Sequence, residues 1–181
     1  MTVDNTNPKF NLSSVARSTW CLALIDCCSP HVLLESDERR QEFGHWQKAV
    51  SKLRAFLAGE LKSDANLERF YQAFSDWEAT YETSDSLNGR ITALVFSATH
   101  TAVAALFDED SDDTQLIRGN IDELHQELGE LGGDMQGLSQ YWQELDAEWS
   151  QKLRDIQQRP VAAATLKEVL STDVSIFGLS S

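Results

Sequence analysis

The chain has 181 residues, a length that suits a single domain. Hydrophobic residues make up 41% and charged residues 24% of it, an ordinary composition for a globular protein, and 3 prolines and 9 glycines leave room for long helices. The formal net charge of −14 disfavours direct binding to nucleic acid or to anionic lipid, because both are polyanions, and it favours a basic partner.

The first part of the chain is expected to form a flexible arm over residues 1–10, ahead of a single helical domain over residues 11–181. The arm has no basic n-region, so a secretory signal is not expected. Asn11 or Ser13 can cap a first helix that ends at about Cys28. Ser29 and Pro30 should stop this helix, because proline disfavours the helical conformation in the residue before it.

Three cysteines, Cys21, Cys27 and Cys28, lie close together in this first helix. Their number is odd, and their spacing matches neither a zinc-binding pair nor a disulfide framework. Buried, reduced thiols are therefore predicted, which fits a reducing cytoplasm.

Two amphipathic helices should follow, one capped by Ser36 or Asp37 and the next by Ser63 or Asp64. In both, large apolar residues recur every three or four positions, which is the helical period. The inward side chains are expected to be Phe43, Trp46, Val50, Leu53 and Leu57 in one helix and Leu67, Phe70, Phe74, Trp77 and Tyr81 in the other.

The stretch 91–107 contains no charged residue and is apolar around most of its circumference. A helix of this kind is either buried or membrane-spanning. Seventeen residues span about 25 Å, short of a bilayer core of about 30 Å, and five polar side chains also argue against lipid. We therefore predict a buried central helix over about residues 86–107, capped by Ser84 or Ser86 and regular from near Arg90. His100 should be a core histidine bonded to a neighbour.

Residues 108–113 form an acidic connector to a fifth helix, and Gly132 and Gly133 separate that helix from a sixth, which Asp134 can cap. Pro160 should end the sixth helix or begin a short seventh one, and residues 174–179 alternate enough to dock in an extended form. The inward side chains are expected to be Leu116, Ile117, Ile121, Leu124, Leu128 and Leu131 in the fifth helix and Leu138, Trp142, Leu145, Trp149, Leu153 and Ile156 in the sixth.

Short breaks between amphipathic helices predict an all-α fold, a single-domain bundle of six to seven helices packed around the buried central helix. The sequence contains no GxSxG, GxxxxGK[ST], GxGxxG or HExxH motif. Accordingly, no catalytic residue and no cofactor is predicted.

Two carboxylate–histidine pairs with helical spacing, Glu42 with His45 and Asp122 with His125, are the candidates for a metal site. Two Glu-x-x-His helices and two further glutamates form the di-iron site of ferritin-like bundles. Here one acid is Asp and the central helix supplies none, so no metal site is predicted.

Asp108, Asp110 and Asp112 alternate as in an EF-hand calcium loop. That loop needs Gly at its sixth position and Glu at its twelfth, where this sequence has Asp113 and Gly119. An EF-hand is therefore not predicted.

Charge is distributed unevenly along the chain. Residues 108–134 contain ten acids and one base, Arg118, which gives a local charge of 1 − 10 = −9. Such a surface can steer a cationic protein toward it. The residues expected to bind the partner are Asp108, Asp110, Asp112, Asp113, Asp122, Glu123, Glu127 and Glu130.

The sequence thus predicts a small acidic cytoplasmic protein that docks a basic protein partner, in the manner of an immunity protein, an antitoxin or another inhibitor. Two alternatives stay open. One is a helical-bundle enzyme or carrier with a metal or apolar ligand in its core, and the other is a structural subunit of an assembly. Neither nucleic acid nor a membrane is expected as a partner, and the oligomeric state is left open.

Overall fold

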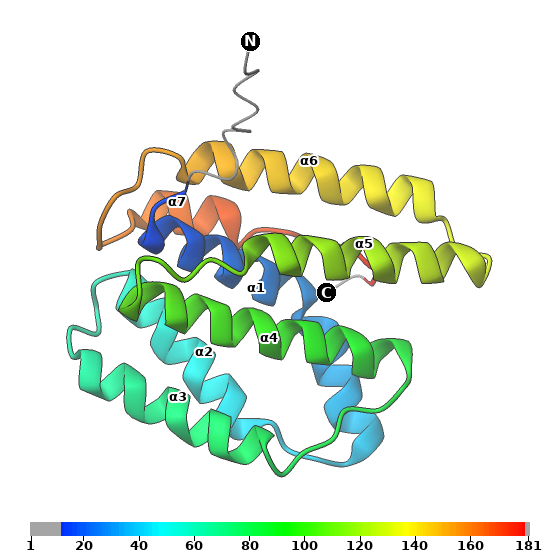
Figure 1. The fold of residues 1–181 in the computed structure, drawn as a ribbon, viewed down its shortest axis with the longest axis horizontal. Helices are drawn as coiled ribbons and strands as arrows, with labels where there is room; N and C mark the ends of the chain where they lie inside the picture. The colour runs from blue at the N-terminus through cyan, green and yellow to red at the C-terminus, as the bar shows by residue number, and fades with distance from the viewer. Residues whose placement is uncertain (1–11, 180–181) are drawn as a thin grey trace.

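The computed structural model describes residues 12–179, and this part of the chain folds into seven helices without a β-sheet (Figure 1). The fold class predicted from the sequence is therefore confirmed. The helices are α1 (Ser14–Arg39), α2 (Gly44–Leu57), α3 (Asp64–Glu78), α4 (Leu87–Phe107), α5 (Thr114–Glu130), α6 (Met135–Leu153) and α7 (Ala163–Val169).

Helices α1 and α4 form the centre of the bundle and make the most extensive contact between any two elements. Ile91, Val95, Ala98 and Ala102 of α4 are fully buried and recur at the helical period. Helix α5 packs beside α4, and α6 beside α5, while α2 and α3 pair on the other side (Figure 1). The predicted burial of α4 is confirmed, and α1 shares the central position.

Within residues 12–179, α4 is the one helix whose length and composition would allow it to cross a membrane. In the folded chain, 61% of its most apolar 18-residue window is buried. Contacts with α1, α2 and α5 therefore account for the absence of charge along this helix.

Helix α1 continues through Pro30 to Arg39, so the prediction that it ends at about Cys28 was wrong. Proline lacks the N–H that would bond to the carbonyl of Asp26, four residues earlier. The Ser29 hydroxyl donates to that carbonyl instead, at 2.9 Å. The turns beyond Pro30 are held by tertiary contacts, since Glu35 is buried and accepts hydrogen bonds from the Ser84 backbone and hydroxyl.

The longer α1 shifts the start of the next helix, and α2 begins at Gly44 rather than after Ser36 or Asp37. Ser13, Ser63, Ser86 and Asp134 cap α1, α3, α4 and α6, as the sequence predicts. Helix α4 is regular from Leu87 rather than from near Arg90. Gly89 lies against the Ser84 backbone with no room for a Cβ, which explains the glycine inside this first turn.

Residues 174–179 do not dock in an extended form. They make a turn in which Ser175 N–H donates to the Leu179 carbonyl and Gly178 N–H donates to the Ser175 carbonyl. Gly178 supplies the positive φ of 89° that this turn needs. The turn buries Ile176 and Phe177 against the bundle.

Candidate functional site

The acidic residues of the connector and of the outer side of α5 form one surface, which we call the acidic face. Its members are Asp108, Glu109, Asp110, Asp112, Asp113, Asp122, Glu123, Glu127 and Glu130. All are exposed except Glu127, which is half-buried. The acids predicted to bind a partner are thus accessible to solvent, Glu127 only partly.

Arg17, a buried residue of α1, holds the connector in place through hydrogen bonds to its backbone. Its guanidinium donates to the backbone carbonyls of Leu12 at 2.9 Å, Glu109 at 2.8 Å and Ser111 at 3.1 Å, and its Nε lies 4.0 Å from the carboxylate of Asp112. Only 9% of Arg17 is exposed. The connector backbone is therefore fixed to α1 by Arg17, a residue that no motif in the sequence singles out.

Two connector carboxylates also order their own loop. The Asp108 carboxylate accepts a hydrogen bond from the Asp110 N–H, and the Asp112 carboxylate accepts from both the backbone and the hydroxyl of Thr114. These bonds order the residues just before α5, as the side chain of a helix cap does. Asp110 and Asp113 make no such bond within residues 12–179 and are left to face solvent.

The single base of the 108–134 region points inward. Arg118 donates two hydrogen bonds to the Asp146 carboxylate, at 2.9 and 3.0 Å, and lies 4.4 Å over the ring of Trp20. The Trp20 indole N–H donates to the same carboxylate at 3.0 Å. The charge of Arg118 is therefore compensated inside the bundle and does not offset the acidic face.

A second base, Arg90 of α4, forms a salt bridge with Glu127, with side chains 41% and 44% exposed. Glu127 is therefore partly neutralised by its own chain. Within residues 12–179, no ion pair involves the other acids of the face except Asp112, which lies beside Arg17.

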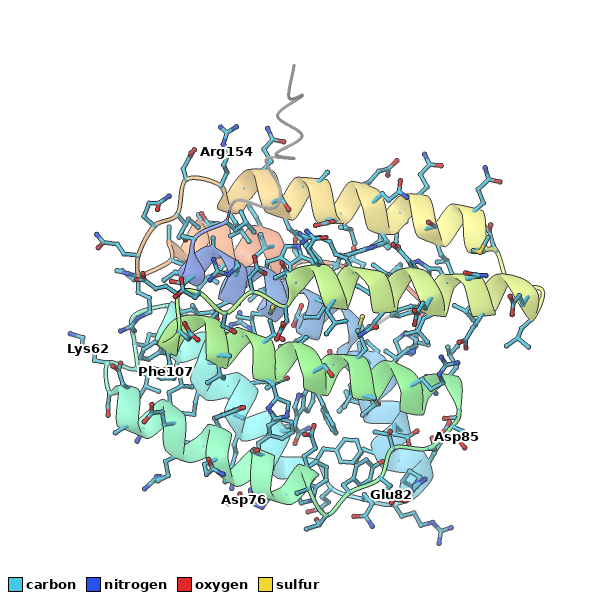
Figure 2. The ribbon with its side chains drawn as sticks, in the orientation of Figure 1. Lys62, Asp76, Glu82, Asp85, Phe107 and Arg154 are labelled. Atoms are coloured by element: carbon cyan, nitrogen blue, oxygen red, sulfur yellow. The ribbon has the colours of Figure 1, made fainter. Side chains whose placement is uncertain are left out.

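Exposed apolar side chains lie at both ends of α5, where the sequence predicted inward residues. Leu116 is 65% and Leu131 is 83% exposed, so both predictions were wrong. Ile117 and Ile121 take the core side of α5, and Leu116 is turned about 100° from Ile117. Leu131 follows the last helical residue. Phe107, also exposed, lies beside the connector at the end of α4 (Figure 2).

Shallow surface clefts flank α5. The cleft between α4 and α5 is lined by Arg90, Glu123 and neighbouring residues. The cleft between α5 and α6 is lined by Asp122, Met135 and several glutamines. Asp122 and Glu123, about 100° apart around α5, therefore lie at the two edges of its outer side, Asp122 toward α6 and Glu123 toward α4.

The candidate metal ligands are not brought together. Glu42 precedes α2 and His45 lies in its first turn, so the two do not share a helix as predicted, and both are exposed. His125 is buried on α5, and its Nε2 bonds to the Ile176 carbonyl at 2.8 Å. Within residues 12–179, no three His, Cys, Asp or Glu side chains are grouped as a metal site would require. Asp122 is exposed, one turn before His125.

The histidine of the central helix is bonded to neighbours, as the sequence predicts. His100 Nδ1 bonds to the Tyr71 hydroxyl and Nε2 to the Glu78 carboxylate, both at 2.7 Å. Burial, and secondarily Glu78, raises the pKa of Tyr71. These bonds tie α3 to α4 at the edge of the core.

The three cysteines are free and buried, as predicted. Burial raises the pKa of Cys21 far above its ordinary value, which keeps this thiol protonated and unreactive.

One constellation that the sequence does not reveal joins Ser175, His31 and Asn88. His31 Nε2 lies 2.6 Å from the Ser175 hydroxyl, and its Nδ1 lies 2.9 Å from the Asn88 side-chain oxygen. A hydroxyl, an imidazole and an orienting amide are the parts of a nucleophilic site. However, Ser175 is only 1% exposed, so no substrate reaches its hydroxyl, and the three groups instead fix residues 174–179 to the bundle.

Comparisons of the chain with protein-family models, with curated proteins and with solved structures find no match. The ordered acidic face is the surface feature from which a function follows.

Proposed function

We propose that this chain is a binding protein that docks a basic protein partner on its acidic face. The observation that carries the proposal is the arrangement of charge. Seven of the face's acids are exposed with no ion pair to residues 12–179, namely Asp108, Glu109, Asp110, Asp113, Asp122, Glu123 and Glu130. Arg118, the one base of the 108–134 region, is bonded to Asp146 in the interior.

The fixed connector supports the same proposal. Because Arg17 bonds to the carbonyls of Glu109 and Ser111, the carboxylates of the connector are held near one geometry before a partner arrives. Preorganisation of this kind lowers the entropic cost of association. A mobile acidic loop would have to be ordered at the moment of binding.

Apolar contacts can supply affinity next to this charge. Phe107 and Leu116 are exposed on either side of the connector. Charged residues around an apolar centre are the usual composition of a protein–protein interface. We therefore propose a partner with a cationic surface and an apolar recess, bound by a cytoplasmic protein of the immunity, antitoxin or inhibitor type.

The test is affinity capture from the native host with two matched baits. The first bait carries Asp110→Lys, Asp122→Lys, Glu123→Lys and Glu130→Lys, four exposed acids of the face. The control bait carries Glu38→Lys, Glu68→Lys, Glu82→Lys and Asp85→Lys, four exposed acids elsewhere. Figure 2 shows Glu82 and Asp85 at the opposite end of the bundle from Phe107.

Both baits change the net charge by the same amount, so a difference between them reports position. The proposal predicts that the wild type and the control capture the same basic protein and that the face variant loses it. Equal capture by all three baits, or a captured partner that is itself acidic, would contradict the proposal. Elution as a homo-oligomer that the face variant dissociates would favour the structural-subunit alternative.

A further inference from the structure

A cleft lies between α2 and α7, on a part of the molecule that the acidic face does not include. Its volume is about 500 Å³, within the roughly 300–1,000 Å³ of small-molecule sites in proteins. Apolar side chains from α2, from α7 and from the segment before α7 line it, namely Ala55, Ala58, Val161, Ala163, Leu166 and Leu170. The cleft therefore has the size and the apolar lining that a small organic ligand needs.

The walls of this cleft are fixed to each other by hydrogen bonds. The Val161 N–H donates to the Leu57 carbonyl at 2.8 Å, which ties the segment before α7 to the end of α2. Arg159 donates to the Phe56 carbonyl at 2.7 Å and lies 3.4 Å over the Phe56 ring. In Figure 1 this orange segment runs down the left end of the bundle. A preformed wall lowers the entropic cost of binding a ligand.

The cleft carries an excess of positive charge, although the chain as a whole is acidic. Its charged lining residues are Arg54, Lys167 and Glu60, which sum to 2 − 1 = +1, against −14 for the chain. Helix α2 contains three Lys or Arg residues and no acid. The one acid of α7, Glu168, does not line the cleft and forms a salt bridge with Lys152 of α6 at 3.5 Å. The local charge is therefore reversed where α2 and α7 meet.

Both bases of the cleft are accessible. Arg54 and Lys167 are exposed, and neither forms a salt bridge with another residue of the 12–179 region. Burial raises the pKa of Asp26 on α1 and the charge of Arg54 opposes this shift, so the two groups interact, but Asp26 does not line the cleft. The hydroxyl-bearing residues Ser51 and Ser171 complete the polar part of the lining.

We propose that the cleft between α2 and α7 binds a small carboxylate with an apolar body, whose negative charge is bonded by Arg54 and Lys167. Guanidinium and ammonium groups form strong, charge-assisted hydrogen bonds with carboxylates. One negative charge neutralises the net charge of the lining, whereas a dianion would add negative charge to a chain that is already acidic. The apolar body packs on Ala55 and Leu166. This site does not rest on the proposed partner, because it shares no residue with the acidic face.

The two bases also have a structural role. Arg54 and Lys167 lie in the last turns of α2 and α7, where a cation interacts favourably with the helix dipole. That role explains a base at each position, but it does not explain an apolar cleft between them. Thermal unfolding measures the structural role and ligand titration measures the site, so the two are separated by experiment.

The test titrates the isotope-labelled full chain with naphthalene-1-acetate, an aromatic monocarboxylate, and with naphthalene-1-acetamide, its neutral counterpart. We expect the carboxylate to shift the backbone N–H resonances of Ala55, Leu166 and Leu170 in a saturable manner, with a Kd below about 1 mM. The neutral compound should bind at least about tenfold more weakly. The N–H resonances of Ala93 and Ser97, in the cleft between α4 and α5, should not shift.

Two matched double variants test the role of the bases. The variant with Arg54→Gln and Lys167→Gln removes both bases of the cleft and should bind the carboxylate at least about tenfold more weakly. The variant with Lys48→Gln and Lys62→Gln removes two exposed bases outside the cleft and should bind it as the wild type does. Glu60→Gln removes the acid of the cleft and should tighten binding about twofold or more.

A further variant tests the cleft itself. Ala55→Leu adds apolar volume to the cleft without changing its charge, and it should weaken binding about tenfold or more. Thermal unfolding checks that each variant folds, and the charge variants decide if Ala55→Leu does not.

The site would be refuted if the carboxylate caused no saturable shift up to about 10 mM, or if the neutral compound bound equally well. It would also be refuted if the two double variants bound the carboxylate with the same affinity. A lower melting temperature of the variant with Arg54→Gln and Lys167→Gln, combined with unchanged binding, would leave the two bases with their structural role alone.

Discussion

Replacement of Arg17 by Met is the most informative single change, because Arg17 links the core to the acidic face. Met keeps an unbranched apolar side chain and removes the donors to Leu12, Glu109 and Ser111. Hydrogen bonds that involve a charged group contribute about 1.5–3 kcal/mol each. The bond to Leu12 is buried, whereas the other two are part-buried, and their carbonyls can regain water.

Counting the buried bond fully and the other two at about half gives about 3–6 kcal/mol. Removal of a buried guanidinium recovers part of this, so we expect a net loss of about 2–4 kcal/mol from a total stability of about 5–15 kcal/mol. Urea unfolding measures the loss, and backbone amide resonances should report a disordered connector.

The control is Arg90→Met, which removes the exposed pair with Glu127. Exposed ion pairs contribute about 0–1 kcal/mol, so this variant should unfold close to the wild type. If Arg17→Met cost no more than Arg90→Met, the view that Arg17 orders the connector would be wrong.

Three further predictions concern the interior. Ala98→Asp buries an unpaired charge in α4 and should abolish cooperative folding, which thermal unfolding checks. A soluble variant that melts cooperatively would contradict the central position of α4. Asp146→Asn removes the buried carboxylate charge to which Arg118 is bonded and should lower the free energy of unfolding, measured in urea, by about 3–5 kcal/mol, whereas Asp155→Asn, at an exposed pair, should lower it little. Because burial lowers the pKa of His31, the unfolded chain binds a proton before the folded chain does, so stability should fall as pH drops below about 6.5, and less so in His31→Gln.

The features that the sequence predicts correctly depend on residues close together in the chain. The absence of charge over 91–107, together with the short length of this stretch and its five polar side chains, predicts a buried helix. Ser13, Ser63, Ser86 and Asp134 mark helix starts, because each bonds to a backbone N–H three residues later. The acidic run is equally visible, because it needs no tertiary information.

The features that were missed depend on contacts between distant residues. Helix α1 passes Pro30 because Ser29 satisfies the free carbonyl and the later turns are held by residues such as Ser84. His31 bonds to Asn88 and Ser175, which are 57 and 144 positions away in the sequence, and no sequence pattern predicts these bonds.

The most direct test of the acidic face is the association rate of the captured partner, measured at rising salt concentration. For the wild type, the rate should fall steeply as the Debye length shrinks from about 10 Å at 0.1 M to about 3 Å at 1 M. The variant with Asp110→Lys, Asp122→Lys, Glu123→Lys and Glu130→Lys should associate at least about tenfold more slowly at low salt, with little dependence on salt and a nearly unchanged melting temperature. A wild-type rate that is indifferent to salt, or a face variant that associates as fast as the control with the same number of reversed charges, would contradict docking on this face.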